Sequence, residues 1–332
     1  MIHLKSVKRN RQTVFYYCVT QKRGNMTIYK FANEIQDKIS ERLGTDYQVR
    51  IQKVQKNNGV HLQGLVISSS TQNISPTFYL DDYFEAYCNG YAMERIIESI
   101  LHIYRENTPK GHIDMSFFKD FQMIKNKICY RLVNAKQNQE LLEKVPHILF
   151  LDLAICFYYA FENEELGSGT ILIYHTHLKM WNATTEELFA LAQKNTPRIF
   201  SWECSSMQKV MEELMNEELE FGEGTLFEMQ ENEPFYRDVP MQILSNRTRT
   251  FGAACILYPG VLEQLSSKFE SDFYILPSSI HEVILLFDSK SESPQELKKM
   301  IAEVNRTQVQ VQEVLSNSLY YYSAKQKQIK IL

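Results

Sequence analysis

Residues 148–181 read ILFLDLAICFYYAFENEELGSGTILIYHTHLKMW, and the rest of the chain is organised around them. From Ile148 to Phe161 the residues are almost continuously apolar and rich in aromatic and β-branched types, with Asp152 as the one charge before Glu162. Such a run is typical of a strand that is buried on both faces. The acidic residues and the Gly-Ser-Gly that follow favour a turn, after which the residues return to strand-forming types. We therefore predict a central hairpin that the rest of the chain covers.

The length and composition describe an ordinary globular chain. A chain of 332 residues is too long to fold around one small hydrophobic core, so its length predicts two domains. Hydrophobic residues make up 44% and charged residues 23%, and the 19 Tyr and 19 Phe favour half-buried sheet surfaces. A formal net charge of -4 disfavours a general nucleic-acid-binding surface. No apolar run reaches the length that crosses a bilayer, so we expect no membrane-spanning segment.

Motifs for metals, disulfides and phosphates are missing from the sequence. The six cysteines are spaced singly with no CxxC pair, which signals neither a zinc site nor a disulfide framework. The phosphate-binding patterns GxxxxGK(S/T) and GxGxxG and the zinc pattern HExxH are absent as well. We therefore expect no cofactor, and reduced cysteines in a cytoplasmic protein.

The patterns along the chain divide it into three segments. Residues 1–25 carry basic but no acidic residues, and are either a basic arm or an extension upstream of a start at Met26. Residues 26–143 open with an amphipathic helix that ends at Gly44, and they form an N-terminal α+β domain. Residues 144–332 form a C-terminal α+β domain built on the central hairpin.

A pattern of strand, turn, strand and helix recurs at residues 60–105 and 154–193, and more loosely at 273–304. In the last copy, Ser293 and Glu296 have the spacing of a capping box at a helix start. No period is strict, so the similarity is one of pattern. It favours an α+β fold with mixed or antiparallel sheets and packed helices, built from ββα-like units, over a doubly wound sheet.

His281 and Glu282 form the most enzyme-like neighbourhood, because serine, histidine and carboxylate occur there within a few residues. Nucleophilic catalysis needs such groups to converge beside an oxyanion hole, and no GxSxG elbow is present. The ordinary interpretation is a turn before a buried strand, on which the two side chains would point to opposite faces. Asp152 either caps the start of its strand or pairs with a base such as Arg131, and is a secondary catalytic candidate.

His175 and His177 are two residues apart on a predicted strand, so both would face the same side. Zinc sites use such pairs, but they need a third protein ligand, and no nearby motif supplies one. We interpret the two as ordinary histidines at a hairpin end, with a metal site as the weaker alternative.

Glutamates crowd the segment from residue 212 to residue 233, which contains no basic residue. Such a block usually forms a solvated helix face followed by a loop, and the alternative is a docking surface for a basic partner protein. The candidate contact residues of that surface are Glu212, Glu213, Glu217 and Glu218.

Five separated stretches, in order, carry a resemblance to a known family. They read NNGVHLQGLVI, NISPTFYLDDYFEAYCNG, VPHILFLDLAICFYY, FGAACILYPGVLEQL and LPSSIHEVILL. There the chain resembles a family of uncharacterised bacterial proteins, common in gut Clostridia and known as a domain of unknown function. The likeness covers about Met26 to the C-terminus. It implies a bacterial cytosolic origin, and it brings no catalytic residue, ligand or partner.

Taken together, the sequence favours a non-catalytic protein-interaction or regulatory protein, because it has no catalytic motif and its charges are unevenly placed. The alternative is a hydrolase-type enzyme with a site near His281 and Glu282. Nucleic-acid binding through residues 1–23 is a third hypothesis, which the acidic net charge disfavours.

Overall fold

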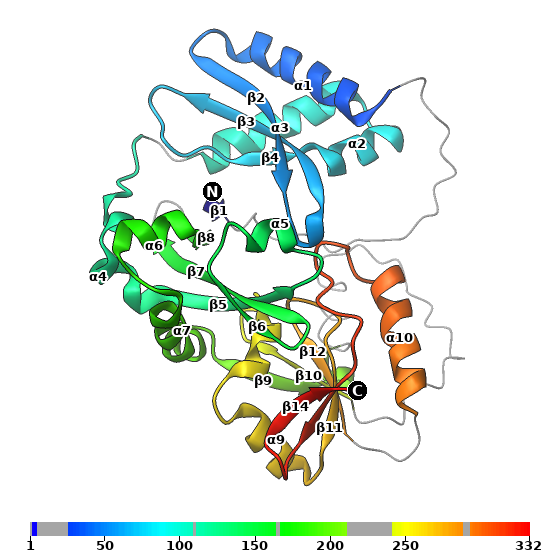
Figure 1. Ribbon diagram of the computed structural model, residues 1–332. Coiled ribbons are helices and arrows are strands. Elements are labelled where there is room, and N and C mark those ends of the chain that lie inside the picture. The colour runs from blue at the N-terminus through cyan, green and yellow to red at the C-terminus, as the bar shows by residue number, and fades with distance from the viewer. Residues whose placement is uncertain (1, 5–25, 109–110, 164–166, 211–240, 288–292) are drawn as a thin grey trace. The chain divides into compact units, whose positions relative to one another are not determined.

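The computed structural model describes residues 2–4, 26–108, 111–163, 167–210, 241–287 and 293–332. In it the chain is an α+β protein whose helices pack on antiparallel sheets (Figure 1). The chain folds as two compact units, which are Met1–Asp120 with Ala160–Ile171, and Phe121–Tyr159 with Leu172–Leu332. None of the described helices has the length and apolar character to span a membrane.

The first unit contains a three-stranded sheet in the order β2-β3-β4, with helices packed against it (Figure 1). Its elements are α1 (Ile28–Leu43), β2 (Tyr47–Gln55), the 3₁₀ helix η1 (Asn57–Gly59), β3 (His61–Ser69), β4 (Thr77–Tyr79), α2 (Leu80–Cys88), α3 (Met93–Asn107) and η2 (Ser116–Lys119). The predicted amphipathic helix is α1, which Gly44 ends with a φ of 76°. Its buried Phe31 and Ile35 share a core with Leu65 of β3 and Ile97 of α3.

The predicted central hairpin is formed by β7 (Leu153–Asn163) and β8 (Gly167–Leu172), which are neighbours in a second sheet. Four strands of this sheet follow the order β1-β8-β7-β5, and the fifth strand, β6, pairs with β7. Its other strands are β1 (Ile2–Leu4), β5 (Ile128–Asn134) and β6 (His147–Phe150). The tip of the hairpin belongs to the first unit and its base to the second.

The prediction of one continuous strand from Ile148 to Phe161 is wrong. β6 ends at Phe150, Leu151 adopts a φ of 54°, and β7 returns antiparallel to β6. The cause is Asp152, whose carboxylate would lack hydrogen-bond donors inside a strand buried on both faces. In the turn it accepts hydrogen bonds from three hydroxyl groups.

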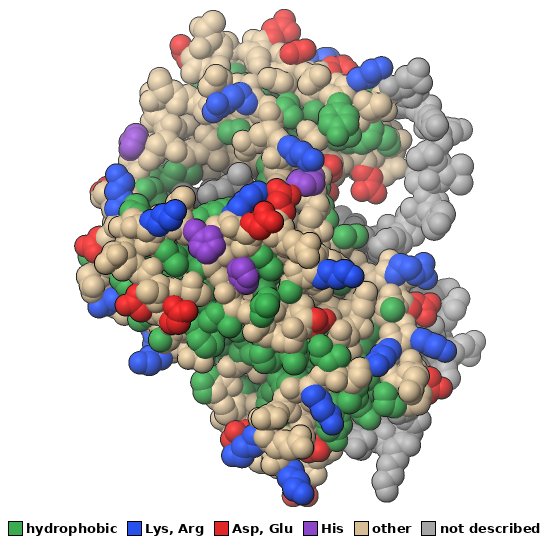
Figure 2. Space-filling view, in the orientation of Figure 1, with side chains coloured by type: hydrophobic (Ala, Val, Ile, Leu, Met, Phe, Trp, Pro, Cys, Tyr) green, Lys and Arg blue, Asp and Glu red, His purple; other side chains and the backbone are tan. Residues whose placement is uncertain are grey.

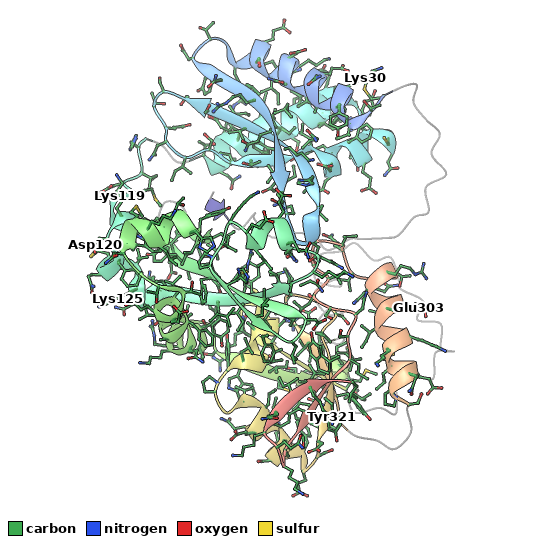
Figure 3. The ribbon with its side chains drawn as sticks, in the orientation of Figure 1. Lys30, Lys119, Asp120, Lys125, Glu303 and Tyr321 are labelled. Atoms are coloured by element: carbon green, nitrogen blue, oxygen red, sulfur yellow. The ribbon has the colours of Figure 1, made fainter. Side chains whose placement is uncertain are left out.

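The third sheet lies in the second unit and is antiparallel throughout, in the order β14-β13-β11-β12-β10-β9. Its strands are β9 (Trp202–Ser206), β10 (Met241–Asn246), β11 (Phe273–Leu276), β12 (Val283–Phe287), β13 (Tyr320–Ser323) and β14 (Gln328–Ile331). Helix α10 (Pro294–Thr307) starts at the predicted capping box and buries Leu297 and Ile301 in a cluster with Leu276 of β11. Tyr321, labelled in Figure 3, lies on β13. Its hydroxyl donates to Asp272, 3.0 Å away.

The second unit contains further short and long helices. They are α4 (Phe121–Ile124), η3 (Lys125–Lys127), α5 (Gln139–Leu142), α6 (His175–Trp181), α7 (Thr185–Ile199), η5 (Gly252–Leu257) and α9 (Val261–Phe269). Of these, α6 and α7 connect the second sheet to the third along the chain. The predicted order of two strands and an amphipathic helix is found as β3-β4 with α3, β7-β8 with α7, and β11-β12 with α10, and the structure adds the short helices α2 and α6 before the predicted helices of the first two units.

The structure divides the chain after Asp120, whereas the sequence places the boundary near Glu143. The reason is that β5 pairs with β7 along its whole length, from Ile128 opposite Tyr159 to Asn134 opposite Leu153. Residues on both sides of Glu143 therefore belong to one unit.

Candidate functional site

His281 and Glu282 lie in the turn before β12, because that strand begins only at Val283. The ordinary interpretation, a turn before a buried strand, is therefore confirmed, whereas the strand itself does not include His281 and Glu282. The imidazole of His281 stacks on the ring of Phe251 at 6.0 Å, and its Nδ1 accepts a long hydrogen bond (3.4 Å) from the Phe251 N–H. On its other side, Nε2 lies 3.9 Å from Glu313 Oε1. These contacts hold the ring in place.

Two serines contact His281, and both do so through its backbone. Ser279 Oγ accepts a hydrogen bond from the His281 N–H at 3.0 Å, and Ser245 Oγ donates to the His281 carbonyl at 2.7 Å. In the described part of the chain, the imidazole itself has no hydrogen bond to a hydroxyl or thiol. This geometry explains a well-fixed turn, and a hydrolase site at His281 stays a prediction.

Asp152 gathers three hydroxyl groups from the segment that leads into β13. Ser316 Oγ donates to it at 2.5 Å, Ser318 Oγ donates at 2.8 Å, and the Tyr320 hydroxyl donates to its other oxygen. Burial, together with this hydrogen bond and the charge of Asp152, raises the pKa of Tyr320 well above its usual value. We call these four residues the Asp152 clamp. It ties the β6–β7 turn to the third sheet, and Arg131 is not among its members.

Arg131 occupies a row of side chains that the sequence did not reveal. It lies on β5 opposite Cys156 of β7, and Cys156 in turn lies opposite His147 of β6. The Arg131 guanidinium is 4.9 Å from the ring centre of Phe251, and its Nε is buried without a hydrogen-bond partner. Burial lowers the pKa of Arg131.

The thiol in this row is not a nucleophile at neutral pH. Burial raises the pKa of Cys156 to about 11, and the side chain is fully buried, so it stays protonated and inaccessible. Sequence reasoning missed the row because only the register of three strands brings its members together. The one available signal was a lone arginine inside the apolar strand β5.

His175 and His177 lie at the start of helix α6, so the prediction that they share a strand face is wrong. The Nδ1 of His177 accepts a hydrogen bond from the Tyr174 N–H at 3.1 Å, and its ring packs 5.5 Å from that of Trp181. Burial lowers the pKa of His177. Among the residues that the structure describes, no group of three or more His, Cys, Asp or Glu could hold a metal ion.

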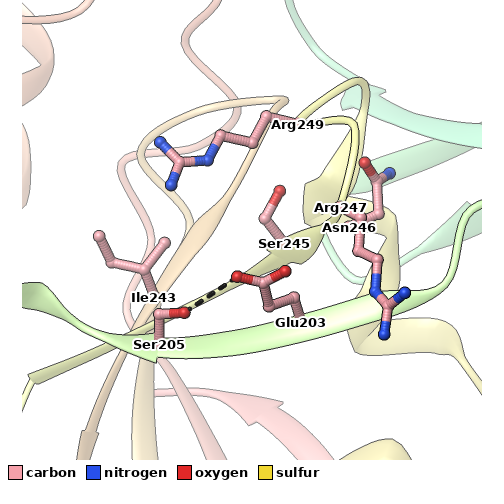
Figure 4. Close-up of a pocket in the computed structure, with 7 residues that line it drawn as sticks. All are labelled: Glu203, Ser205, Ile243, Ser245, Asn246, Arg247 and Arg249. Atoms are coloured by element: carbon pink, nitrogen blue, oxygen red, sulfur yellow. Dashed lines mark hydrogen bonds between the residues drawn. The ribbon is translucent and has the colours of Figure 1, made fainter. Parts of the chain in front are cut away.

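A small hollow opens between β9 and the loop after β10 (Figure 4). Its volume of about 40 Å³ is suited to water rather than to a substrate. Glu203 at its floor accepts a hydrogen bond from Ser205 at 3.1 Å, and the Asn246 side chain holds the loop through the backbone of Thr250. Asn246 thus fixes the loop, while Glu203 and Ser205 bond to each other within β9.

The outer edge of β6 is the candidate interaction site. β6 pairs with β7 on one side, and no described strand pairs with its other side. Leu149 is 67% exposed there, and Leu151 in the adjacent turn is 39% exposed. β6 carries no charged residue, like the shorter edge strands β1 and β4, whereas the edge strands β2, β9 and β14 carry Arg50, Glu203 and Lys330 respectively. Proteins usually place charges on exposed edges to prevent pairing with another chain.

The acidic candidates Glu212, Glu213, Glu217 and Glu218 lie outside the described residues. On the face shown in Figure 2, acidic and basic side chains are interspersed.

A comparison with known families matches the chain to the Family of unknown function (DUF5688) over residues 28–324. The chain belongs to this family. The DUF5688 match confirms the resemblance seen in the sequence, and it includes β6, the Asp152 clamp and the His281 turn. No curated protein and no solved structure matches the chain.

Proposed function

We propose that the chain is a non-catalytic protein-interaction or regulatory protein, which binds an extended protein segment along the outer edge of β6. The observation that carries the proposal is the 67% exposure of Leu149 on an edge strand without charge. Such an edge offers unpaired N–H and C=O groups, to which an extended segment adds as a further strand.

The register of the β6–β7 hairpin indicates which peptide groups face outward. Phe150 lies opposite Leu153 across a two-residue turn, and residues in that position exchange hydrogen bonds with each other. The peptide groups of Phe150 and Ile148 therefore face β7. Those of His147 and Leu149 face the outer edge, where an added strand would bond to them.

The Asp152 clamp holds this edge in place before any partner binds. Asp152 directly follows the last exposed residue of the edge, and its carboxylate is bonded to Ser316, Ser318 and Tyr320. A binding strand that is already ordered loses little conformational entropy on association. The clamp thus supports recognition without taking part in it.

A peptide titration tests the proposal. The probe is a fluorescein-labelled peptide with the sequence VPHILFLD, which is uncharged over the paired positions, and the readout is fluorescence anisotropy. We expect saturable binding with a Kd in the micromolar range, corresponding to about −8 kcal/mol or weaker. The Leu149→Pro variant removes the outward N–H of residue 149. A proline is tolerated at such an edge position because this N–H has no partner within the sheet, so we expect the chain to fold but not to bind the peptide.

Two results would contradict the proposal. One is the absence of saturable binding to the wild-type chain, and the other is equal binding to the wild type and Leu149→Pro. A peptide of the same sequence, N-methylated at alternate residues, is the matched control because it keeps the apolar surface and loses the donors.

The glutamate-rich segment is a second docking surface in this proposal, for a basic partner protein. Its test is a pull-down with the wild-type chain and with a variant in which Glu212, Glu213, Glu217 and Glu218 are glutamine. A partner set that does not change between the two would refute the acidic surface.

The compartment that fits this function is a reducing one. Cys129, Cys156 and Cys255 are buried free thiols, and the exposed Cys88 is free as well. Free cysteines of this kind are typical of cytoplasmic proteins, and the bacterial source implied by the resemblance in the sequence is part of the proposal.

A further inference from the structure

We propose that the segment bound by β6 is β6 of a second copy of this chain, so that two copies form a symmetric dimer through one continuous sheet. This inference rests on the proposed function, since it names the partner of the same edge. Antiparallel pairing of two identical edges creates a two-fold interface, which closes at the dimer and does not propagate.

The sequence of β6 is complementary to itself when it runs antiparallel. With Leu149 on the two-fold axis, it lies opposite Leu149 of the second copy. Ile148 then lies opposite Phe150 of the second copy, and Phe150 opposite Ile148. Each of these contacts joins two apolar side chains on the same sheet face, and aliphatic–aromatic pairs of this kind stabilise antiparallel sheets.

The alternation of inward-facing and outward-facing peptide groups along β6 matches this register. Because the peptide groups of Leu149 face outward, a Leu149 pair on the axis would exchange both of its N–H···O=C hydrogen bonds. A register shifted by one residue would direct the apolar sets of the two copies to opposite faces. The positions of the outward-facing peptide groups and the pattern of apolar side chains therefore both favour the register with Leu149 on the two-fold axis.

Charge separates β6 from the edge strand β2, and exposure separates it from the uncharged edge strand β4, whose Phe78 is buried. A similar antiparallel pairing of β2 would bring together edges that carry Arg50 and Lys53, and like charges across strands are destabilising. The four residues of β6 introduce no such repulsion. Because β6 is so short, the interface lies below the ~1,600 Å² of standard complexes, and we expect dissociation in the micromolar range.

Sedimentation velocity on the full chain, from low micromolar to several hundred micromolar, measures the dimer. We expect a concentration-dependent shift from monomer to dimer. The Leu149→Lys variant places two ammonium groups opposite each other at the axis, and it is expected to remain monomeric at every concentration. The matched control is Met123→Lys, which adds the same charge at a residue with 66% exposure on α4, and it should dimerise like the wild type.

A cross-link reads the register directly and does not depend on the charged variant. In a Cys18→Ser, Cys88→Ser background, Leu149→Cys places two thiols opposite each other within the range of a disulfide. Mild oxidation should convert it to a covalent dimer, whereas Met123→Cys in the same background should stay monomeric.

The inference is overturned if the wild type is monomeric throughout, if Leu149→Lys still dimerises, or if Leu149→Cys does not cross-link. The VPHILFLD titration separates this failure from that of the proposed function. A monomeric chain that binds the peptide through Leu149 has an edge that accepts strands but not a second copy. A monomeric chain that does not bind the peptide refutes both.

Discussion

Replacing Asp152 by alanine is the sharpest test of how the second unit is held together. The carboxylate is the common acceptor for Ser316, Ser318 and Tyr320, which lie 164 to 168 residues further along the chain. Its removal should loosen the β6–β7 turn from the third sheet, and the loss appears as a lower free energy of unfolding.

The size of the expected loss in unfolding free energy depends on which hydroxyl groups stay buried in the Asp152→Ala variant. Ser316 and Tyr320 are 1% and 0% exposed, so both keep a donor without an acceptor when the carboxylate is gone. Each buried orphan donor costs about 1–3 kcal/mol, whereas the half-exposed Ser318 can turn to water. We therefore expect Asp152→Ala to lose about 2–5 kcal/mol, which is a large part of the stability of an ordinary domain.

A second variant separates the clamp from a general packing effect. Tyr320→Phe keeps the ring and removes one donor, and it should lose about 0.5–2 kcal/mol. The double variant Asp152→Ala, Tyr320→Phe has no Tyr320 hydroxyl left without an acceptor. Its loss of unfolding free energy should therefore be smaller than the sum of the two single-variant losses by about 0.5–3 kcal/mol.

Urea unfolding at neutral pH, followed by circular dichroism, measures all three variants against the wild type. Ser318→Ala is the control, with a loss below about 1 kcal/mol because its hydroxyl is half-exposed. The reasoning is refuted if Asp152→Ala stays within about 0.5 kcal/mol of the wild type, or if the two losses simply add.

Three further predictions concern the second unit. Gly252→Ala should lose about 1–3 kcal/mol in urea unfolding, because the added Cβ would lie 2.4 Å from the His281 carbonyl oxygen and 2.8 Å from the Asn246 nitrogen. Arg131→Met should stay within about 1 kcal/mol of the wild type or be more stable, since it replaces a guanidinium whose Nε is buried and unpaired, and a loss above about 3 kcal/mol would contradict this. The urea midpoint should fall as the pH rises past about 10. Burial raises the pKa of several tyrosines in the folded chain, so above this pH the folded chain binds more protons than the unfolded one and loses stability. A midpoint that does not change with pH would contradict this prediction. These tyrosines are Tyr130, Tyr158, Tyr258 and Tyr320.

The features that the sequence predicted correctly depend on short-range contacts. The end of α1 at Gly44 and the start of α10 at Ser293 are both set by hydrogen bonds within a few residues. The ββα-like units follow from alternation of pattern, which is also local. His175 and His177 show the limit of that signal, because the apolar residues before them continue a strand pattern into the first turn of α6.

The sites depend on contacts between residues far apart, and pattern reasoning does not supply them. Asp152 was singled out as a charge that needed partners, but those partners come from residues 316–320, which end at the first residue of β13. Arg131 and Cys156 meet only through the register of β5 and β7. For Asp152 the sequence predicted that a buried charge needs partners, and the tertiary structure supplies them.

The edge strand β6 shows why an apolar run does not by itself mean burial. Its residues have the composition of a strand that is covered on both sides, yet Leu149 is 67% exposed. One exposed leucine is common on protein surfaces, and burying it fully would contribute about 1.5–3 kcal/mol. Its significance lies in its surroundings, because outward peptide groups and uncharged neighbours make the same edge a template for another strand. A strand of a second copy at this edge would place an apolar side chain beside Leu149 on the same sheet face, which accounts for the apolar composition of β6.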